Sequence, residues 1–287
     1  MTDILNQTIQ AILLGGLYAM YALGLAVSVG VLRFVNVAHG DMIVLISFLF
    51  LSVTQLLGLP ILVGALLMIP VGMGLGWLLQ RGIFQRAAGM GELQVILVAF
   101  GLSIVIQNVL LAGYGADARR VSASGLEAAS FPILPEVYVG VVPLIIFVAA
   151  VAMIFLLDRI LHATRLGIAI RAIADSLVAG QLNGLPVRKL QAATMAIVGV
   201  TIAVAGVFMA VWTNFEPSAG PSRLLVAFEV VVLAGLGSYW GVLIAGILIA
   251  AAQTLGASID SAFQILGGHL VFLVLFLLRP NGLFPRR

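Results

Sequence analysis

Long apolar segments alternate with short polar turns along almost the whole chain. An α-helix needs roughly 20 mostly apolar residues to cross the hydrocarbon core of a bilayer, so the chain has room for about eight or nine transmembrane segments. The pattern therefore predicts an all-α fold, a polytopic bundle of membrane helices. The expected spans are 9–31, 42–57, 61–79, 93–113, 137–157, 191–212 and 262–278, together with one longer apolar run at 224–255.

The run at 224–255 is too long for one comfortable span and short for two. Its middle contains the glycine-rich sequence GLGSYWG at 235–241. Irregular backbone at membrane depth survives only where protein or a water-filled cavity covers it, because lipid offers no hydrogen bonds. We therefore expect a broken helix here, with two short helices that meet inside the protein.

Composition agrees with a membrane protein and removes several other classes. Hydrophobic residues make up 62% of the 287 positions and charged residues 9%, whereas a soluble domain has roughly 25% charged residues. The chain is therefore interpreted as a single transmembrane domain, 1–287. It has no cysteine, which excludes disulfides and cysteine metal sites, and its three histidines are too scattered to suggest a metal site. The N-terminus lacks the basic region of a cleavable signal peptide.

The positive charge of the chain lies in a few loops beside the spans, so it indicates membrane topology and not nucleic-acid binding. Cytoplasmic loops carry the excess of Lys and Arg. We therefore expect Arg33, the loop with Arg81 and Arg86, the 158–190 loop and the 279–287 tail in the cytoplasm. This orientation puts the N-terminus outside and the C-terminus inside, and it requires the long apolar run to cross twice.

The 158–190 loop is the longest polar interval, and it carries five of the fourteen basic residues. Within it, 166–182 has the pattern of one short amphipathic helix, which Gly184 and Pro186 end. Such a helix between two spans is suited to docking a cytoplasmic partner. Its apolar residues fall near one face, namely Ile168, Ala172, Ala179 and Leu182.

The sequence shows no catalytic nucleophile with a base, no metal-ligand spacing and no phosphate-binding loop, so an enzyme is not expected. The 158–190 loop has no ATP-binding motif, and energy from ATP would have to come from another chain. An ionisable residue in a span is a functional candidate because it costs about 2.5–3.5 kcal/mol at the helix centre. Glu229 is the clearest case, although it also fits a shallow acid near the outer interface. His269 is expected at the interface of the last span.

Four stretches of the chain resemble one family of transporters. The segment LRFVNVAHG at 32–40 resembles the motif R-x-x-N-x-A-H-G, and RPNGLF at 279–284 resembles the family's tail. The loop sequence at 166–184 and the glycine-rich break at 232–246 also resemble segments of the family, and the four stretches follow one another in the order expected for it. The chain therefore resembles the permease subunit of a bacterial ABC importer for branched-chain amino acids, the Liv type, in its shorter form.

The resemblance implies partners and a location. These are two ABC ATPase subunits that hold ATP and Mg²⁺, a second and different permease, a periplasmic substrate-binding protein and the lipids of the bacterial inner membrane. No cofactor is expected in this chain. The helix in the 158–190 loop would transmit the closure of the ATPases, with Arg171 and Asp175 as polar contacts. The expected coupling residues are Gly167, Arg171, Ala172, Asp175, Ala179 and Gly184.

The translocation path is expected among the first two spans and the glycine-rich break, at Asn36, His39, Glu229, Gly235 and Gly237. Gly235 and Gly237 would let backbone groups face a cavity. Urea, short amides and other amino acids stay open as substrates, because similar permeases serve different ligands. A secondary carrier working alone is the other class, although few charges lie in the spans and no internal repeat is visible.

Overall fold

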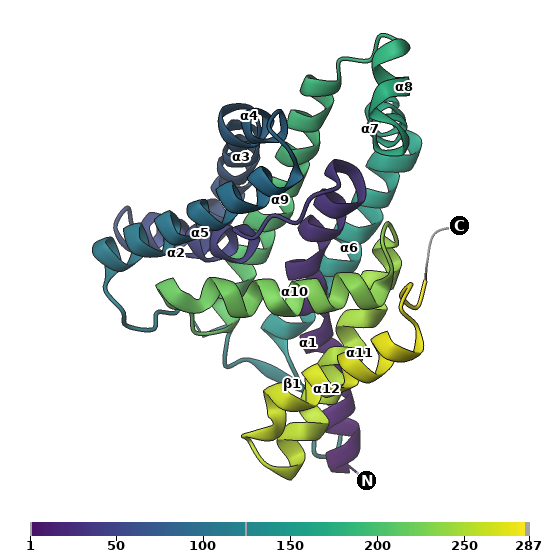
Figure 1. Cartoon of the computed structure of the whole chain (residues 1–287). Helices are drawn as coiled ribbons and strands as arrows, with labels where there is room; N and C mark the ends of the chain where they lie inside the picture. The colour runs from purple at the N-terminus through teal and green to yellow at the C-terminus, as the bar shows by residue number, and fades with distance from the viewer. Residues whose placement is uncertain (1, 124, 285–287) are drawn as a thin grey trace.

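The computed structural model describes residues 2–123 and 125–284 as a helical bundle with one small β-hairpin (Figure 1). The helices differ in length, and several are joined without a loop. In chain order the elements are α1 (Thr2–Val27), η1 (Ser28–Leu32, π-helical), α2 (His39–Gln55), α3 (Ile61–Leu79), η2 (Gln80–Phe84, π-helical), α4 (Gln85–Ala88), α5 (Glu92–Tyr114), β1 (Ser130–Leu134), β2 (Val137–Gly140), α6 (Val141–Ala163), α7 (Arg165–Asp175), α8 (Leu177–Leu182), α9 (Val187–Trp212), η3 (Pro217–Ala219, 3₁₀), α10 (Gly220–Ala234), α11 (Tyr239–Ile259) and α12 (Phe263–Leu278).

The predicted polytopic helical bundle is confirmed. Among the described residues, 7 helices are long and apolar enough to cross a membrane, and two shorter apolar helices, α2 and α12, accompany them. The run at 224–255 is broken as expected, because α10 ends at Ala234 and α11 begins at Tyr239. Between them Gly235 and Gly237 have φ of +89° and +87°, a left-handed backbone that glycine adopts without steric cost.

Two of the expected boundaries that differ from the structure have clear physical reasons. The loop with Arg81 and Arg86, expected between the spans at 61–79 and 93–113, is helical to Ala88 through η2 and α4, because Gln85-Arg86-Ala87-Ala88 are good helix formers. The span expected at 137–157 begins instead with strand β2, and α6 starts at Val141. In residues 137–140 the β-branched Val137 and Val139 alternate with Tyr138, a pattern that favours a strand, and the segment pairs antiparallel with β1. The hairpin covers part of the end of the molecule that holds the N-terminus (Figure 1).

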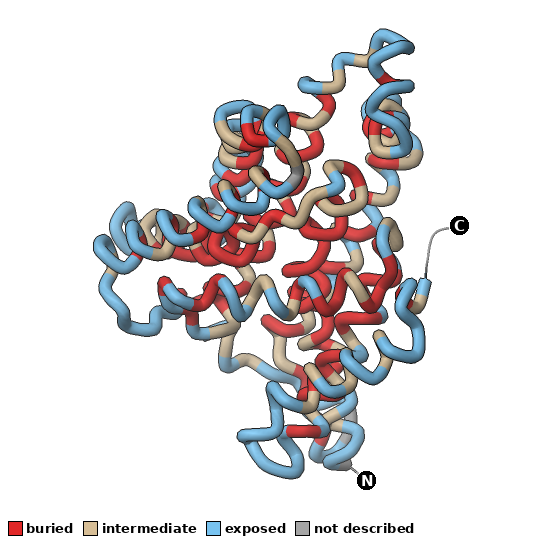
Figure 2. The backbone as a smooth tube through the Cα atoms, viewed as in Figure 1, coloured by how far each residue is buried: buried red, intermediate tan, exposed pale blue. Residues whose placement is uncertain are grey.

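Helix α1 lies in the middle of the bundle, and buried residues gather around it (Figure 2). A Cβ on Gly15 would lie 2.5 Å from the Cα of Ile247 in α11, and one on Gly16 would lie 2.9 Å from the Cα of Phe147 in α6. Small residues let helix backbones approach closely in lipid, where packing drives association. The glycines of the first span therefore form packing faces.

Helix α3 attaches to α9 through the same kind of contact. A Cβ on Gly72 would lie 2.3 Å from the carbonyl oxygen of Gly199, and one on Gly76 would lie 2.1 Å from that of Met195. The rest of α3 and much of α5 expose large apolar side chains. An apolar outer surface is what lipid or a partner membrane subunit requires.

The loop between α5 and β1 lies outside the membrane-spanning helices, and it is held by backbone and side-chain bonds. Arg119 pairs with Phe215 as an isolated antiparallel bridge. The Glu127 carboxylate accepts hydrogen bonds from the Ser122 hydroxyl and from the Ala123 amide. The Ser122 bond, followed by backbone amides, lowers the pKa of Glu127 below its ordinary value.

Candidate translocation and coupling sites

The segment 33–38 runs back along α1 before α2 begins. It starts at Arg33, whose φ of 58° turns the chain after η1. His39, the first residue of α2, places its Nε2 2.8 Å from the carbonyl oxygen of Tyr21 in α1. Helix α2 therefore starts beside the middle part of α1 and not at its end. Non-helical backbone such as that of 33–38 must be covered by protein wherever it lies at membrane depth.

Asn36 and His39, both expected on the path, are buried and hold this turn. The Oδ1 of Asn36 accepts a hydrogen bond of 3.1 Å from the amide of Ala38, and its Nδ2 lies 3.4 Å from the Sδ of Met42. Both side chains are at most 1% exposed. Their observed contacts are structural, because they satisfy backbone groups where α2 begins, and a path role for them stays a prediction.

Asp41 is a buried acid in the first turn of α2. Its Oδ1 accepts a hydrogen bond of 2.9 Å from Gln107 in α5. A Cβ on Gly220, the first residue of α10, would lie 1.9 Å from the same oxygen. The N-terminal ends of α2 and α10 therefore meet at this carboxylate, and both carry positive partial charge. This convergence explains how an acid is tolerated inside the bundle.

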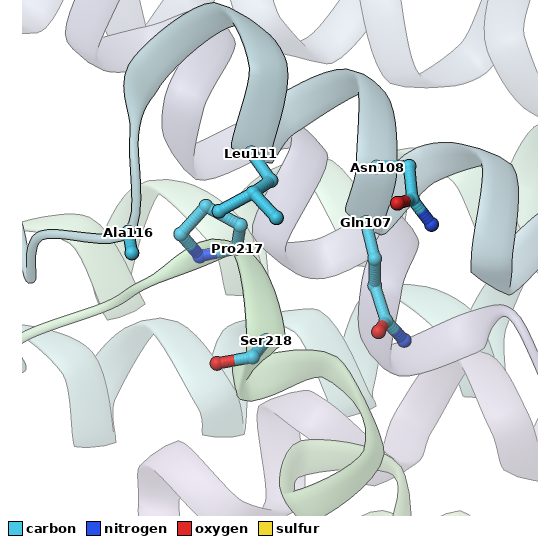
Figure 3. A pocket seen from close by; sticks show the side chains of 6 residues that line it. All are labelled: Gln107, Asn108, Leu111, Ala116, Pro217 and Ser218. Atoms are coloured by element: carbon cyan, nitrogen blue, oxygen red, sulfur yellow. The ribbon is translucent and has the colours of Figure 1, made fainter.

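A small pocket of about 120 Å³ lies beside this contact (Figure 3). Helix α5 contributes three of its side chains, and the segment before α10 contributes two. Its lining consists of Gln107, Asn108, Leu111, Ala116, Pro217 and Ser218. The Nε2 of Gln107 also lies 3.2 Å from the Ser103 hydroxyl, so the amide joins the pocket to the buried acid.

Glu229 and His269, which are 40 residues apart in sequence, form a pair between α10 and α12. The Nδ1 of His269 lies 2.5 Å from the Oε1 of Glu229. The Glu229 side chain is 4% exposed and that of His269 32%. Glu229 is thus a buried acid and His269 is its hydrogen-bond partner, whereas the depth of both residues in the membrane stays a prediction. Beside them the Tyr18 hydroxyl donates to the Oε1 of Gln253 over 2.5 Å.

The C-terminal segment closes over the glycine-rich break, so two motifs that are separate in sequence touch. The amides of Leu283 and Phe284 donate to the carbonyls of Leu233 and Ala234 over 2.8 and 3.1 Å. These carbonyls end α10 and would otherwise lack helical partners. A Cβ on Gly235 would lie 3.1 Å from Phe284. Gly235 is therefore covered by the tail instead of facing a cavity; residues 285–287 lie outside the described part.

Gly237, two residues on, lines a cavity of about 620 Å³. The cavity lies between η1, the break and α7, and it includes Arg33, Arg171 and Asp175. The structure thus brings a predicted path residue and two predicted coupling residues to one space. Helical periodicity within each segment does not reveal that contact, because the three segments are far apart in sequence.

The coupling segment consists of two helices and not the single helix expected at 166–182. Ser176 has an extended backbone (φ −153°, ψ 113°), and its hydroxyl accepts from the amide of Ala179 over 3.2 Å. Thr164 caps α7 in the same way, through the amide of Gly167. Serine and threonine favour such N-cap positions because their oxygens satisfy free helix amides. Ser176, directly after Asp175, was therefore the residue in the sequence that indicated the start of a second helix.

One side of α7 is fixed to the membrane helices. A Cβ on Gly167 would lie 2.1 Å from the carbonyl oxygen of Ile160 in α6. The Nε of Arg171 donates to the carbonyl of Leu161 over 2.9 Å, and the Nη2 of Arg33 donates to the carbonyl of Asp175 over 3.1 Å. Arg171 is therefore turned toward α6. A motion of α7 would be transmitted to α6 and to the end of η1.

The other side of α7 and α8 is exposed at the end of the molecule opposite the N-terminus (Figures 1 and 2). Ala172, Asp175 and Ala179 are exposed there. Gly184 ends α8 with a φ of +75°, and no atom lies within 4 Å of the position of a Cβ. The same surface exposes large apolar side chains, which we call the apolar coupling surface: Leu166, Ile168, Leu177, Val178 and Leu182.

Comparison with known protein families matches residues 7–278 to one family model, the permease component of branched-chain amino acid transport systems. The chain belongs to this family. The permease has no group of three or more His, Asp or Glu side chains suited to a metal ion among its described residues.

Curated relatives of this permease match it over nearly their whole length. It is 27% identical to the high-affinity branched-chain amino acid transport system permease protein BraD of Pseudomonas aeruginosa, over 98% of this chain and 96% of that protein. It is 24% identical to LivH of Escherichia coli over the same shares. A solved chain of PsaBC from Streptococcus pneumoniae aligns with a TM-score of 0.49 at 16% identity, over 96% of this chain and 91% of that one.

Proposed function

We propose that this permease is a transmembrane subunit of an ATP-driven importer for branched-chain amino acids in a bacterial inner membrane. A binding protein delivers the amino acid to the periplasmic face. A second, different permease completes the path, and two ATPase subunits supply the energy. The N-terminus lies in the periplasm and the C-terminus in the cytoplasm, where the basic loops are. Family membership and the names of the relatives support the substrate class.

The apolar coupling surface is the observation that carries the proposal. Leu182 is 83% exposed and Val178 is 67% exposed. They lie on short helices beyond the long apolar spans, in the loop with the most basic residues, so a cytoplasmic protein is a better occupant than lipid. The opposite side of α7 is bonded to α6 and η1. An ATPase subunit that binds this surface would therefore move α6 and η1.

The test is purification of the tagged permease from its native membrane, followed by reconstitution and ATP-dependent uptake of radiolabelled leucine. We expect two ATPase subunits and a second permease to copurify. Leu182→Asp should abolish copurification of the ATPases while the permease stays folded, because a charge would have to be buried on docking. The matched control is Leu56→Asp, whose side chain is 80% exposed in the turn before α3.

Retention of the ATPases by the Leu182→Asp variant would overturn the coupling role.

The buried Glu229–His269 pair favours one other candidate, a carrier driven by an ion gradient, since paired acids and histidines in a span can relay protons. Leucine uptake by the permease alone, driven by a proton gradient and abolished by Glu229→Gln, would establish that carrier instead of the importer.

A further inference from the structure

The cavity of about 620 Å³ between η1, the glycine-rich break and α7 has walls of two kinds. One wall is charged and consists of Arg33, Arg171 and Asp175. The rest of the lining is mostly apolar, with Val29, Val31 and Leu236 among its residues. Leu236 is 56% exposed, which leaves an apolar side chain without cover in a space that also holds two guanidinium groups.

We propose that this cavity is the cytoplasmic exit site for the transported amino acid, and that it binds the zwitterion of an apolar amino acid. This inference rests on the proposed function and adds the site and the chemistry of recognition. A guanidinium matches a carboxylate in geometry as well as in charge. The carboxylate of Asp175 complements an ammonium group. The apolar wall at Leu236 receives a branched side chain.

The two arginines keep donors free for a ligand. Arginine has five N–H donors. In Arg171 the Nε donates to the carbonyl of Leu161, and in Arg33 the Nη2 donates to the carbonyl of Asp175. These bonds hold both side chains in place, and both residues line the cavity. A space of this size is within the usual range for small-molecule sites and can hold one amino acid.

The position of the cavity links release to the coupling helices. Arg171, Ala174 and Asp175 all belong to α7, whereas Gly30 belongs to η1 and Gly237 to the break. A Cβ on Gly30 would lie only 3.9 Å from the Cα of Gly237, so these two walls are in close contact. Movement of α7 against them changes the width of the cavity. The ATPases would therefore control the exit site directly through its charged wall.

The absence of cysteine from the chain makes a direct test possible. Leu236→Cys introduces a single thiol on this subunit, and its labelling by a fluorescent maleimide is followed in the complete purified complex. L-Leucine at about twice its dissociation constant should slow labelling about threefold. 4-Methyl-2-oxopentanoate lacks the ammonium group and isopentylamine lacks the carboxylate, and neither should protect. Arg33→Gln should remove the protection by leucine, and Arg33→Lys should restore part of it.

Leu62→Cys is the matched control, since Leu62 is 71% exposed on α3, away from this cavity. Leucine should leave its labelling unchanged. Equal labelling of Leu236→Cys with and without leucine, in a complex that imports leucine, would overturn the exit site and leave the proposed function intact. Equal protection by all three compounds would overturn recognition of the zwitterion. If the unmodified complex imports no leucine, the proposed function itself is refuted.

Discussion

Replacement of Gly282 by alanine tests whether the tail closes the glycine-rich break. Gly282 has a φ of +82°, and a Cβ there would lie 2.5 Å from both the Cα and the N of Gly235. Neither contact can be relieved by a side-chain rotation, because both atoms belong to backbone. We therefore expect Gly282→Ala to lift the tail from the end of α10.

The cost has two parts. An alanine in the left-handed region costs about 1–2 kcal/mol wherever it is placed. Lifting the tail also breaks the bonds from the amides of Leu283 and Phe284 to the carbonyls of Leu233 and Ala234, and two such bonds contribute about 1–3 kcal/mol together. This second part is local, and it corresponds to an increase of about 5- to 140-fold in the opening equilibrium of the tail.

Hydrogen exchange read by mass spectrometry measures this opening at residues 283 and 284. The control is Gly58→Ala, because Gly58 has a similar φ of +62° and no atom lies within 4 Å of the position of a Cβ. It carries the strain of the left-handed backbone without the collision. Faster exchange of the tail amides is expected only in Gly282→Ala. Equal exchange in both variants would refute the docking of the tail.

Three further predictions concern packing, the buried pair and coupling. Gly199→Ala should weaken the contact of α3 with α9 by about 1–3 kcal/mol through overpacking, because its Cβ would lie 2.0 Å from the carbonyl oxygen of Gly72. The control is Gly74→Ala on α3, whose Cβ would meet nothing within 4 Å. In a thermal melt in detergent, the control should be neutral or stabilising. His269→Phe should lower stability by about 1–3 kcal/mol, since it removes the donor to a buried carboxylate; a melting temperature equal to that of the parent would contradict the pairing. Gly184→Val should reduce leucine uptake at unchanged membrane content more than Gly184→Asn does, because asparagine tolerates a positive φ and a β-branched residue does not; equal uptake by the two variants would show that this backbone conformation does not matter for coupling.

Corrections to the sequence-based expectations arise where one local signal competes with another. The helix expected at 166–182 is divided because Ser176 caps a new helix more favourably than it continues the old one. The strand at Val137–Gly140 replaces the start of a span because it has a partner at Ser130–Leu134. In both places hydrophobicity alone was compatible with a continuous helix.

The sequence alone indicated most of the membrane spans, the break at 235–241 and the loop that carries the coupling helices, because these follow from apolar length, glycine content and charge along the chain. Only the tertiary structure decided that Glu229 meets His269, that the tail covers Gly235, and that Gly237 shares a cavity with Arg33 and Asp175. In lipid, apolar helix faces gain no hydrophobic energy from meeting one another, so hydropathy does not select the partners. Close packing at glycines and the pairing of a few buried polar groups select them.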